Sequence, residues 1–317
     1  MMEMESAETL YGSLQGITSF ELYPAGNLKE CVLSEANLLK TSFGPLIPQY
    51  QNDGVRRKYV KSLSFYSDGH LKSISLQKAA PIETSAGIFP AELVTFHSNG
   101  GVKRLFPLNG KISGFWSEGE EYQLAPEFGF HFPFGDFKRK IIGIQFYQNG
   151  AVKSLTFWTQ DKVMLNSPVG PIETRIGFSL YPDGRLKTLE PAKPTPVPTP
   201  VGEIEAFYVD AVGIHGDTNS LSFTAEGAVS GLTTSSCRIT VSGNQRRFIY
   251  QPSLKPSLFD EEKMDTVPLK IEFNGEQVRF GGMESPWYDI TQYSFSITRI
   301  PLSRNGCQGC SACISGS

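Results

Sequence analysis

The sequence predicts an all-β protein, an antiparallel meander of about six two-stranded hairpin repeats in an elongated, coiled single-layer or partly rolled sheet. Three observations carry this prediction: a turn motif that recurs along the chain, a fixed distance to a second turn, and the composition. The 31 glycines, 21 prolines and 12% aromatic residues suit many short turns between strands better than helices. Two packed sheets and a closed barrel are the second and third alternatives.

The recurring motif is clearest from Phe65 to Leu76, where Asp68-Gly69 separates two apolar stretches. An Asn or Asp before Gly favours the left-handed backbone of a tight hairpin, or of a type I turn with a G1 bulge. We expect the aromatic residue before the turn to pair across the strands with the Leu or Val after it. The glycines assigned to these structural turns are Gly26, Gly69, Gly100, Gly150, Gly184 and Gly227.

A second turn signal lies between successive copies of the first. The distance between first-turn and second-turn glycines is 18 residues in three copies and 20 in a fourth. These pairs are Gly26 and Gly44, Gly69 and Gly87, Gly184 and Gly202, and Gly150 and Gly170. A longer period of 158 residues lays residues 62–65 on residues 220–223, both Ser-Leu-Ser-Phe. The simplest account is an array that grew by duplication.

The strand after each turn departs from simple alternation. In one copy its apolar positions are Leu71, Ile74 and Leu76, so the alternation of apolar and polar residues is displaced by one residue after Leu71. Val152, Leu155 and Phe157 repeat the shift in another copy. The pattern predicts a β-bulge or a strand bend just after the turn.

We divide the chain into four parts. Residues 1–16 are a lead-in, with a short opening strand as the alternative, and 17–245 are the repeat array. Residues 246–302 form an atypical C-terminal β cap, and 303–317 a flexible, Cys-rich tail.

Two segments interrupt the rhythm of the array. Residues 106–137 are rich in aromatic side chains, which we interpret as packing against the sheet rather than as a binding surface. Residues 191–200 alternate with proline but keep the 18-residue spacing. We expect an extended edge strand or a surface polyproline segment there, not a domain boundary.

The charge balance limits the classes of partner. The net charge is −3, which argues against nucleic acid or an acidic membrane surface as the main partner. Neither a signal peptide nor an apolar run approaching about 18 residues is present, so we expect a cytoplasmic protein. The five cysteines, an odd number, also fit a reducing compartment. The oligomeric state is left open.

The pattern of an aromatic residue, any residue, Asp or Asn, Gly, any residue, Leu or Val, and Lys resembles MORN-type repeats. The resemblance is to their divergent, antitoxin-like bacterial set, and covers roughly residues 17–245. The chain is also similar to uncharacterised repeat proteins of anaerobic bacteria. MORN units have a shorter period and more glycines per unit than this chain. The resemblance implies a β-hairpin array used for binding, and it implies no catalytic residue.

The sharpest local signal for chemistry is Cys307, Cys310 and Cys313. This spacing can place three thiolates around zinc or an iron–sulfur cluster. A ferredoxin-type run would have a fourth cysteine at position 317, where serine stands. The fourth ligand would come from Cys31, Cys237, Ser317, a small molecule or another chain. The alternative is a flexible tail with reactive thiols.

Other candidate residues favour structural roles. His215 and Asp217 could form half of an acid–base or metal site, but an Asp that stabilises a turn is the preferred interpretation. A row of lysines follows the turns and favours solubility over anion binding. These are Lys29, Lys72, Lys103, Lys153 and Lys187.

The sequence contains no Gly-rich phosphate loop, nucleophile elbow or His-Glu-x-x-His motif. We therefore expect no enzyme, but a scaffold that presents an extended surface to a protein partner. The alternative is a metal-binding or electron-transfer protein that uses the cysteine tail.

Overall fold

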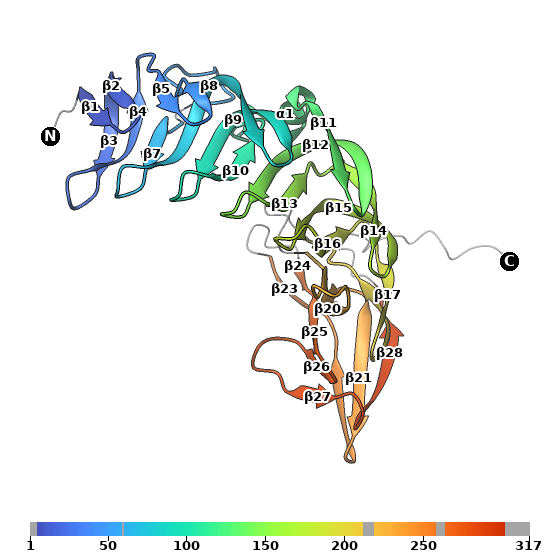
Figure 1. The fold of residues 1–317 in the computed structure, drawn as a ribbon. Helices are drawn as coiled ribbons and strands as arrows, with labels where there is room; N and C mark the ends of the chain where they lie inside the picture. Colours follow the sequence, from blue (N-terminus) through green and yellow to red (C-terminus); the bar gives the residue numbers. More distant parts are fainter. Residues whose placement is uncertain (1–4, 59, 212–218, 258–263, 302–317) are drawn as a thin grey trace. The chain divides into compact units, whose positions relative to one another are not determined.

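A computed structural model of the chain describes residues 5–58, 60–211, 219–257 and 264–301. Nearly all of its regular structure is antiparallel β-sheet, with one short helix among the described residues (Figure 1). The prediction of an all-β meander is confirmed. The chain forms two compact units. Unit 1 comprises the described parts of Met1–Asp161 and Ile176–Arg185, and unit 2 those of Lys162–Arg175, Leu186–Val212 and Thr218–Ser317.

Unit 1 is a sheet of hairpins that follow one another in chain order. Its elements are β1 (Ser6–Thr9), β2 (Gly12–Gln15), β3 (Ile17–Leu22), β4 (Leu28–Leu33), β5 (Leu39–Thr41), β6 (Gly44–Leu46), β7 (Leu63–Phe65), β8 (Leu71–Thr84), β9 (Gly87–Phe96), β10 (Val102–Phe106), α1 (Glu118–Leu124), β11 (Glu127–Phe132), β12 (Gly135–Phe146), β13 (Val152–Phe157) and the end of β15 (Gly170–Leu180). The sheet runs β3, β4, β7, β8, β9, β10, β12, β13, β15. Because β3 pairs only with β4 among the described strands, the sheet is open and not a barrel.

Unit 2 continues the same kind of structure. Its elements are β14 (Lys162–Ser167), the start of β15, β16 (Leu186–Pro191), β17 (Thr195–Thr199), β18 (Gly202–Ala206), β19 (Leu221–Phe223), β20 (Val229–Thr234), β21 (Cys237–Gly243), β22 (Arg246–Tyr250), β23 (Ser253–Pro256), β24 (Met264–Val267), β25 (Leu269–Asn274), β26 (Gln277–Phe280), β27 (Trp287–Asp289) and β28 (Ser294–Arg299). One sheet runs β16, β19, β20, β25, β26, β27, and a second runs β22, β21, β28.

The first turns are type I turns with a G1 bulge. In the β7–β8 hairpin the Gly69 N–H donates to the Tyr66 carbonyl at 3.0 Å, and the Tyr66 N–H donates to the His70 carbonyl at 2.8 Å. Gly69 has φ +86°, a conformation that costs glycine little. The other five turn glycines have φ between +83° and +89°. The cross-strand expectation is wrong in one detail: Leu71 lies opposite Phe65, and Tyr66 sits in the turn itself.

The predicted irregularity after the turn is a register shift. In β7–β8 the shift falls between Ser64 and Phe65, opposite the stretch that contains Lys72. The same shift occurs beside the turn in β3–β4, β9–β10, β12–β13 and β19–β20. The irregularity predicted from the apolar spacing, a β-bulge or a strand bend, is therefore confirmed as a register shift of one residue.

In four of the first turns a side chain with a ring connects its hairpin to the next one. Tyr66 Oη donates a 2.7 Å hydrogen bond to the carbonyl of Phe96, which directly precedes the following turn. The same contact recurs between Tyr23 and Phe65, His97 and Phe146, and Tyr147 and Leu180. In Figure 1 the turns of unit 1 lie side by side along one edge of the sheet. The repeated tyrosine thus fixes neighbouring repeats relative to each other.

We expect Tyr66→Phe to lower the free energy of unfolding by about 1 kcal/mol, because the Phe96 carbonyl loses its donor while the ring stays in place. Urea denaturation followed by circular dichroism measures this change. Tyr50→Phe is the matched control, since the Tyr50 hydroxyl has no hydrogen bond in the described part of the chain. Equal stability of the two variants would contradict the role given to Tyr66.

The second turns share a hydroxyl residue three positions before their glycine. Thr84 Oγ1 donates to the Gly87 carbonyl at 2.8 Å and accepts from the Ala86 N–H at 3.2 Å. The arrangement recurs at Thr9, Thr41, Ser167 and Thr199. The copy at Thr9 joins β1 to β2, so residues 1–16, expected as a lead-in or a short opening strand, contain a complete hairpin.

The aromatic segment 106–137 includes a further hairpin, β11–β12, which has Phe132 in place of the hydroxyl residue. Its rings pack on the sheet: the Phe134 and Phe137 centroids lie 5.2 and 6.2 Å from that of Phe178. The interpretation as a packed core is confirmed for this hairpin, while Phe115 is 82% exposed. Helix α1 was not predicted, although Ser117 and Glu120 form a capping box that signals a helix start.

The proline-rich segment forms β17, an extended strand paired with β18. Pro196 and Pro198 are exposed, and Val197 between them is fully buried. This confirms an extended strand rather than a linker.

Of the expected C-terminal cap, β25 pairs with β20 and continues the sheet of the array. Residues 303–317 lie outside the described chain.

Candidate functional site

One face of the unit 1 sheet is apolar and the other carries a series of polar side chains. The apolar face centres on residues that lie opposite one another from strand to strand and are at most 1% exposed. They are Leu63, Ile74, Val94, Leu105, Ile144 and Leu155. Because side chains alternate along a strand, the residue beside each of these points to the opposite face.

We call the polar series on that opposite face the serine row. Each member pairs with the next one across the sheet. It consists of Glu30, Ser64, Ser73, Thr95, Arg104, Gln145, Ser154 and Ser179. The members from Glu30 to Gln145 are partly exposed, whereas Ser154 and Ser179 are buried. The accessible part of the row therefore crosses β4 to β12.

Charged side chains surround the start of the serine row. Ser64 Oγ and Ser73 Oγ lie 2.5 Å apart. Beside them, Lys61 forms an ion pair with Glu30, and Lys29 forms one with Glu21 at 2.8 Å. This contact lowers the pKa of the exposed Glu21 carboxyl. The first lysine of the predicted row thus belongs to the polar face and is paired there.

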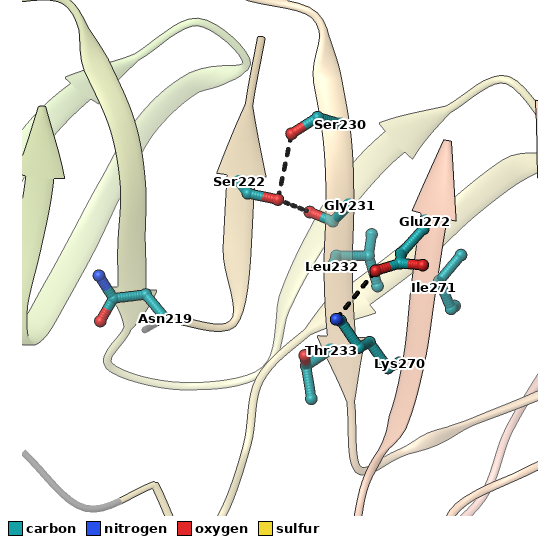
Figure 2. Close-up of a pocket in the computed structure, with 9 residues that line it drawn as sticks. All are labelled: Asn219, Ser222, Ser230, Gly231, Leu232, Thr233, Lys270, Ile271 and Glu272. Atoms are coloured by element: carbon teal, nitrogen blue, oxygen red, sulfur yellow. Dashed lines mark hydrogen bonds and ion pairs between the residues drawn. The ribbon is translucent and has the colours of Figure 1, made fainter. Parts of the chain in front are cut away.

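Unit 2 has a shallow pocket of about 260 Å³ on its sheet (Figure 2). Its floor is formed by β19, β20 and β25, and its hydroxyls are linked to each other. Ser230 Oγ donates to Ser222 Oγ at 3.2 Å, and Ser222 Oγ donates to the Gly231 carbonyl at 3.0 Å. Gly231 has a packing role, because a Cβ there would lie 2.9 Å from the Ile271 carbonyl oxygen.

The opposite rim of the pocket carries an ion pair. Lys270 Nζ lies 2.9 Å from Glu272 Oε1, and Arg279 also pairs with Glu272. The hydrogen bond from Lys270 is the main reason that the pKa of Glu272 falls below its ordinary value. No histidine or cysteine lines the pocket. Its hydroxyls and paired charges suit hydrogen bonding to a ligand, and no serine has a basic partner that would make it a nucleophile.

A buried ionic network in unit 1 serves the fold. The Arg56 guanidinium makes two hydrogen bonds to Glu92, at 3.0 and 2.7 Å, and two to Glu121, both at 2.7 Å. Glu121 also accepts from the Trp116 indole at 2.7 Å and from the Gly110 N–H at 2.8 Å. Every contact is internal, so we assign the network to anchoring the segment around α1.

Unit 2 holds a second buried acid, Glu190, which is 1% exposed. Burial raises its pKa, in spite of the Ser220 N–H that donates to it at 2.7 Å and the Arg175 guanidinium 3.6 Å away. Arg175 in turn donates to the Tyr208 carbonyl at 2.6 Å. The Arg175–Glu190 pair joins β15 and β16 to the loop after β18, so we assign it a structural role, like that of the Arg56 network.

The candidate metal ligands Cys307, Cys310 and Cys313 lie outside the described residues, as do His215 and Asp217. The remaining cysteines, Cys31 and Cys237, are described, buried and unpaired. Burial raises the pKa of Cys31 to about 12, so its thiol stays protonated at neutral pH. Among the residues that are described, no group of three or more Cys, His, Asp or Glu could hold a metal ion.

The sequence contained a signal for the polar face that we did not use. The 158-residue period lays Ser64 of the serine row on Ser222 of the unit 2 pocket. Both residues flank a buried leucine in a three-residue strand, Leu63 in β7 and Leu221 in β19. The two polar sites thus occupy equivalent positions in the 158-residue period.

No family model, curated protein or solved structure matches this chain. The one helix in the described part of the chain is far shorter than a bilayer-spanning helix requires, and no candidate span is found there.

Proposed function

We propose that this chain is a non-catalytic β-repeat scaffold that binds a protein partner through its polar sheet face. The observation that carries the proposal is the serine row, which offers one polar side chain per strand from β4 to β12. Its short members Ser64 and Ser73 can hydrogen-bond an incoming chain with little loss of conformational entropy. The pocket around Ser222 repeats this chemistry in unit 2.

Charge and cysteine chemistry support the class of partner and the compartment. A net charge of −3 favours a protein over nucleic acid. The free thiols of Cys31 and Cys237 agree with a cytoplasmic location.

Photo-cross-linking tests this proposal. With benzoylphenylalanine in place of Ser73 or Ser230, irradiation of cells that make the protein should yield one discrete adduct, identified by mass spectrometry. The control places the same group at Lys40, an exposed residue of the β5–β6 hairpin. We expect adduct formation at Lys40 to be about tenfold lower, the ratio that a preference of 1.4 kcal/mol produces. Equal labelling at all three positions, or no adduct at Ser73, would contradict a partner on the polar face.

A further inference from the structure

Strand β22 is an open sheet edge in unit 2. Among the described strands it pairs with β21 alone, from Arg246 opposite Gly243 to Tyr250 opposite Ile239. Four of its five residues are exposed, among them Ile249 at 57%. The other edge of this small sheet, β28, is partly covered, since Arg299 pairs with Glu205 of β18 at 3.0 Å. β22 is therefore the edge that remains accessible.

The hairpin geometry shows which backbone groups face outward. Asn244 and Gln245 have φ +51° and +57°, which defines a two-residue type I′ turn closed by Gly243 and Arg246. In an antiparallel pair, hydrogen-bonded and non-hydrogen-bonded positions alternate from the turn. The N–H and C=O groups of Arg247 and Ile249 consequently point away from β21. Neither residue has a further backbone bond among the described residues.

The edge strand is held firmly by its other side chains. The Tyr250 hydroxyl lies 2.6 Å from that of Tyr288, and its ring stacks on Phe280 with centroids 5.3 Å apart. Phe248 packs against Tyr288 at 5.8 Å. A rigid edge with unpaired backbone groups is a template for an additional strand.

Charge selects the occupant. Arg246 and Arg247 are exposed on this strand, and neither forms an ion pair with any residue that the structure describes. A second copy of β22 would bring four arginines together, which is unfavourable. An acidic strand would instead place carboxylates beside both guanidinium groups.

We propose that the edge of β22 binds an extended acidic segment of a protein partner as an added β-strand. This inference rests on the proposed scaffold function and gives the partner a chemical class. Backbone groups of Arg247 and Ile249 hold the added strand, and the two arginines select its acidic residues.

The probe is a fluorescein-labelled peptide of eight residues with two adjacent glutamates, one for each face of the sheet, between valines, titrated with the full chain by fluorescence anisotropy. Ile249→Pro removes only an outward-facing donor and should weaken binding at least about tenfold, the equivalent of 1.4 kcal/mol. Ile249→Thr keeps the donor and should bind within about twofold of the unmodified chain.

Two double variants with reversed charge complete the experiment. The double variant Arg246→Glu/Arg247→Glu should lose binding at least about tenfold and bind the peptide with lysine in place of glutamate. The control Lys72→Glu/Lys103→Glu makes the same change in net charge at exposed positions in unit 1 and should bind normally. Circular dichroism verifies the fold, and the arginine variants decide the matter should Ile249→Pro unfold.

Absence of binding by the unmodified chain overturns the inference, as does binding that survives both the proline and the arginine changes. Cross-linking from Ser73 separates this inference from the proposed function. Ser73 adducts from a chain that retains both arginines and yet does not bind the peptide would overturn the β22 site alone, whereas absence of Ser73 adducts overturns the scaffold.

Discussion

Replacing Arg56 by methionine is expected to lower the free energy of unfolding by about 3–5 kcal/mol, because buried Glu121 would lose its counter-charge and Glu92 would keep only the more distant Arg57, 3.8 Å away. The side chains of Glu92 and Glu121 are only 12% and 3% exposed, and Arg56 bridges them with four hydrogen bonds. Urea denaturation of both proteins at pH 7 measures the difference.

Two controls test whether the cost comes from the unpaired charges. Arg56→Met combined with Glu92→Gln and Glu121→Gln removes all three charges and should recover part of the loss. Arg246→Met removes an exposed arginine and should change stability by less than about 0.5 kcal/mol. An Arg56→Met variant as stable as Arg246→Met would show that the network contributes nothing.

The same network determines the direction in which a change of pH alters the stability of the fold. Burial acts to raise the pKa of Glu121, but hydrogen bonds from Arg56 and Trp116 outweigh it and hold the pKa below 4.5, its ordinary value. A lowered pKa in the folded state means that the stabilisation is present above the unfolded-state pKa. It is lost as the pH falls through the folded-state value. Glu121→Gln should therefore flatten the decrease in stability below about pH 4.5.

The turns could be predicted because their signal is local. Gly69 follows an aspartate within a few residues of the strands it joins, and backbone sterics alone require glycine there. The Arg56 network has no such signal, since its partners lie 36 and 65 residues away. Tyr66 combines the two cases. Its turn was predictable from the local sequence, whereas its hydrogen bond to the Phe96 carbonyl, 30 residues further along the chain, depends on how neighbouring repeats are spaced in three dimensions.

The candidate site divides in the same way. Ser64 and Ser222 share a sequence context across the 158-residue period, so their equivalence was within reach of the sequence. The open edge of β22 was not. Whether Ile249 points its backbone to solvent depends on which strands pair with β21 and on the turn at Asn244. Pairing of strands distant in the chain is a property of the whole fold.

Gly177→Ala should be the most damaging single-methyl change in unit 1, with an expected loss of about 3 kcal/mol or more in the free energy of unfolding. Gly177 has φ +153°, and a Cβ built on it would lie 2.0 Å from the Leu155 carbonyl oxygen. That oxygen belongs to the backbone of the neighbouring strand, so no side-chain rotation relieves the clash. Thermal and urea denaturation measure the loss.

The size of this effect follows from a change of strand partner. β15 pairs with β14 as far as Arg175 and with β13 from Gly177 onward, so Gly177 is the first residue of β15 to lie opposite the β13 backbone. Gly150→Ala tests the backbone strain alone, because Gly150 has φ +84° but no atom within 4 Å, and should cost about 1–2 kcal/mol. Gly129→Ala involves neither backbone strain nor a steric clash, because Gly129 has an ordinary φ and its Cβ would have no atom within 4 Å. This change should therefore be nearly neutral. A graded series, with Gly177 well above Gly150 and Gly150 above Gly129, would show that close strand contact limits this position. A Gly177→Ala cost equal to that of Gly150→Ala would mean that the two strands can separate at little expense.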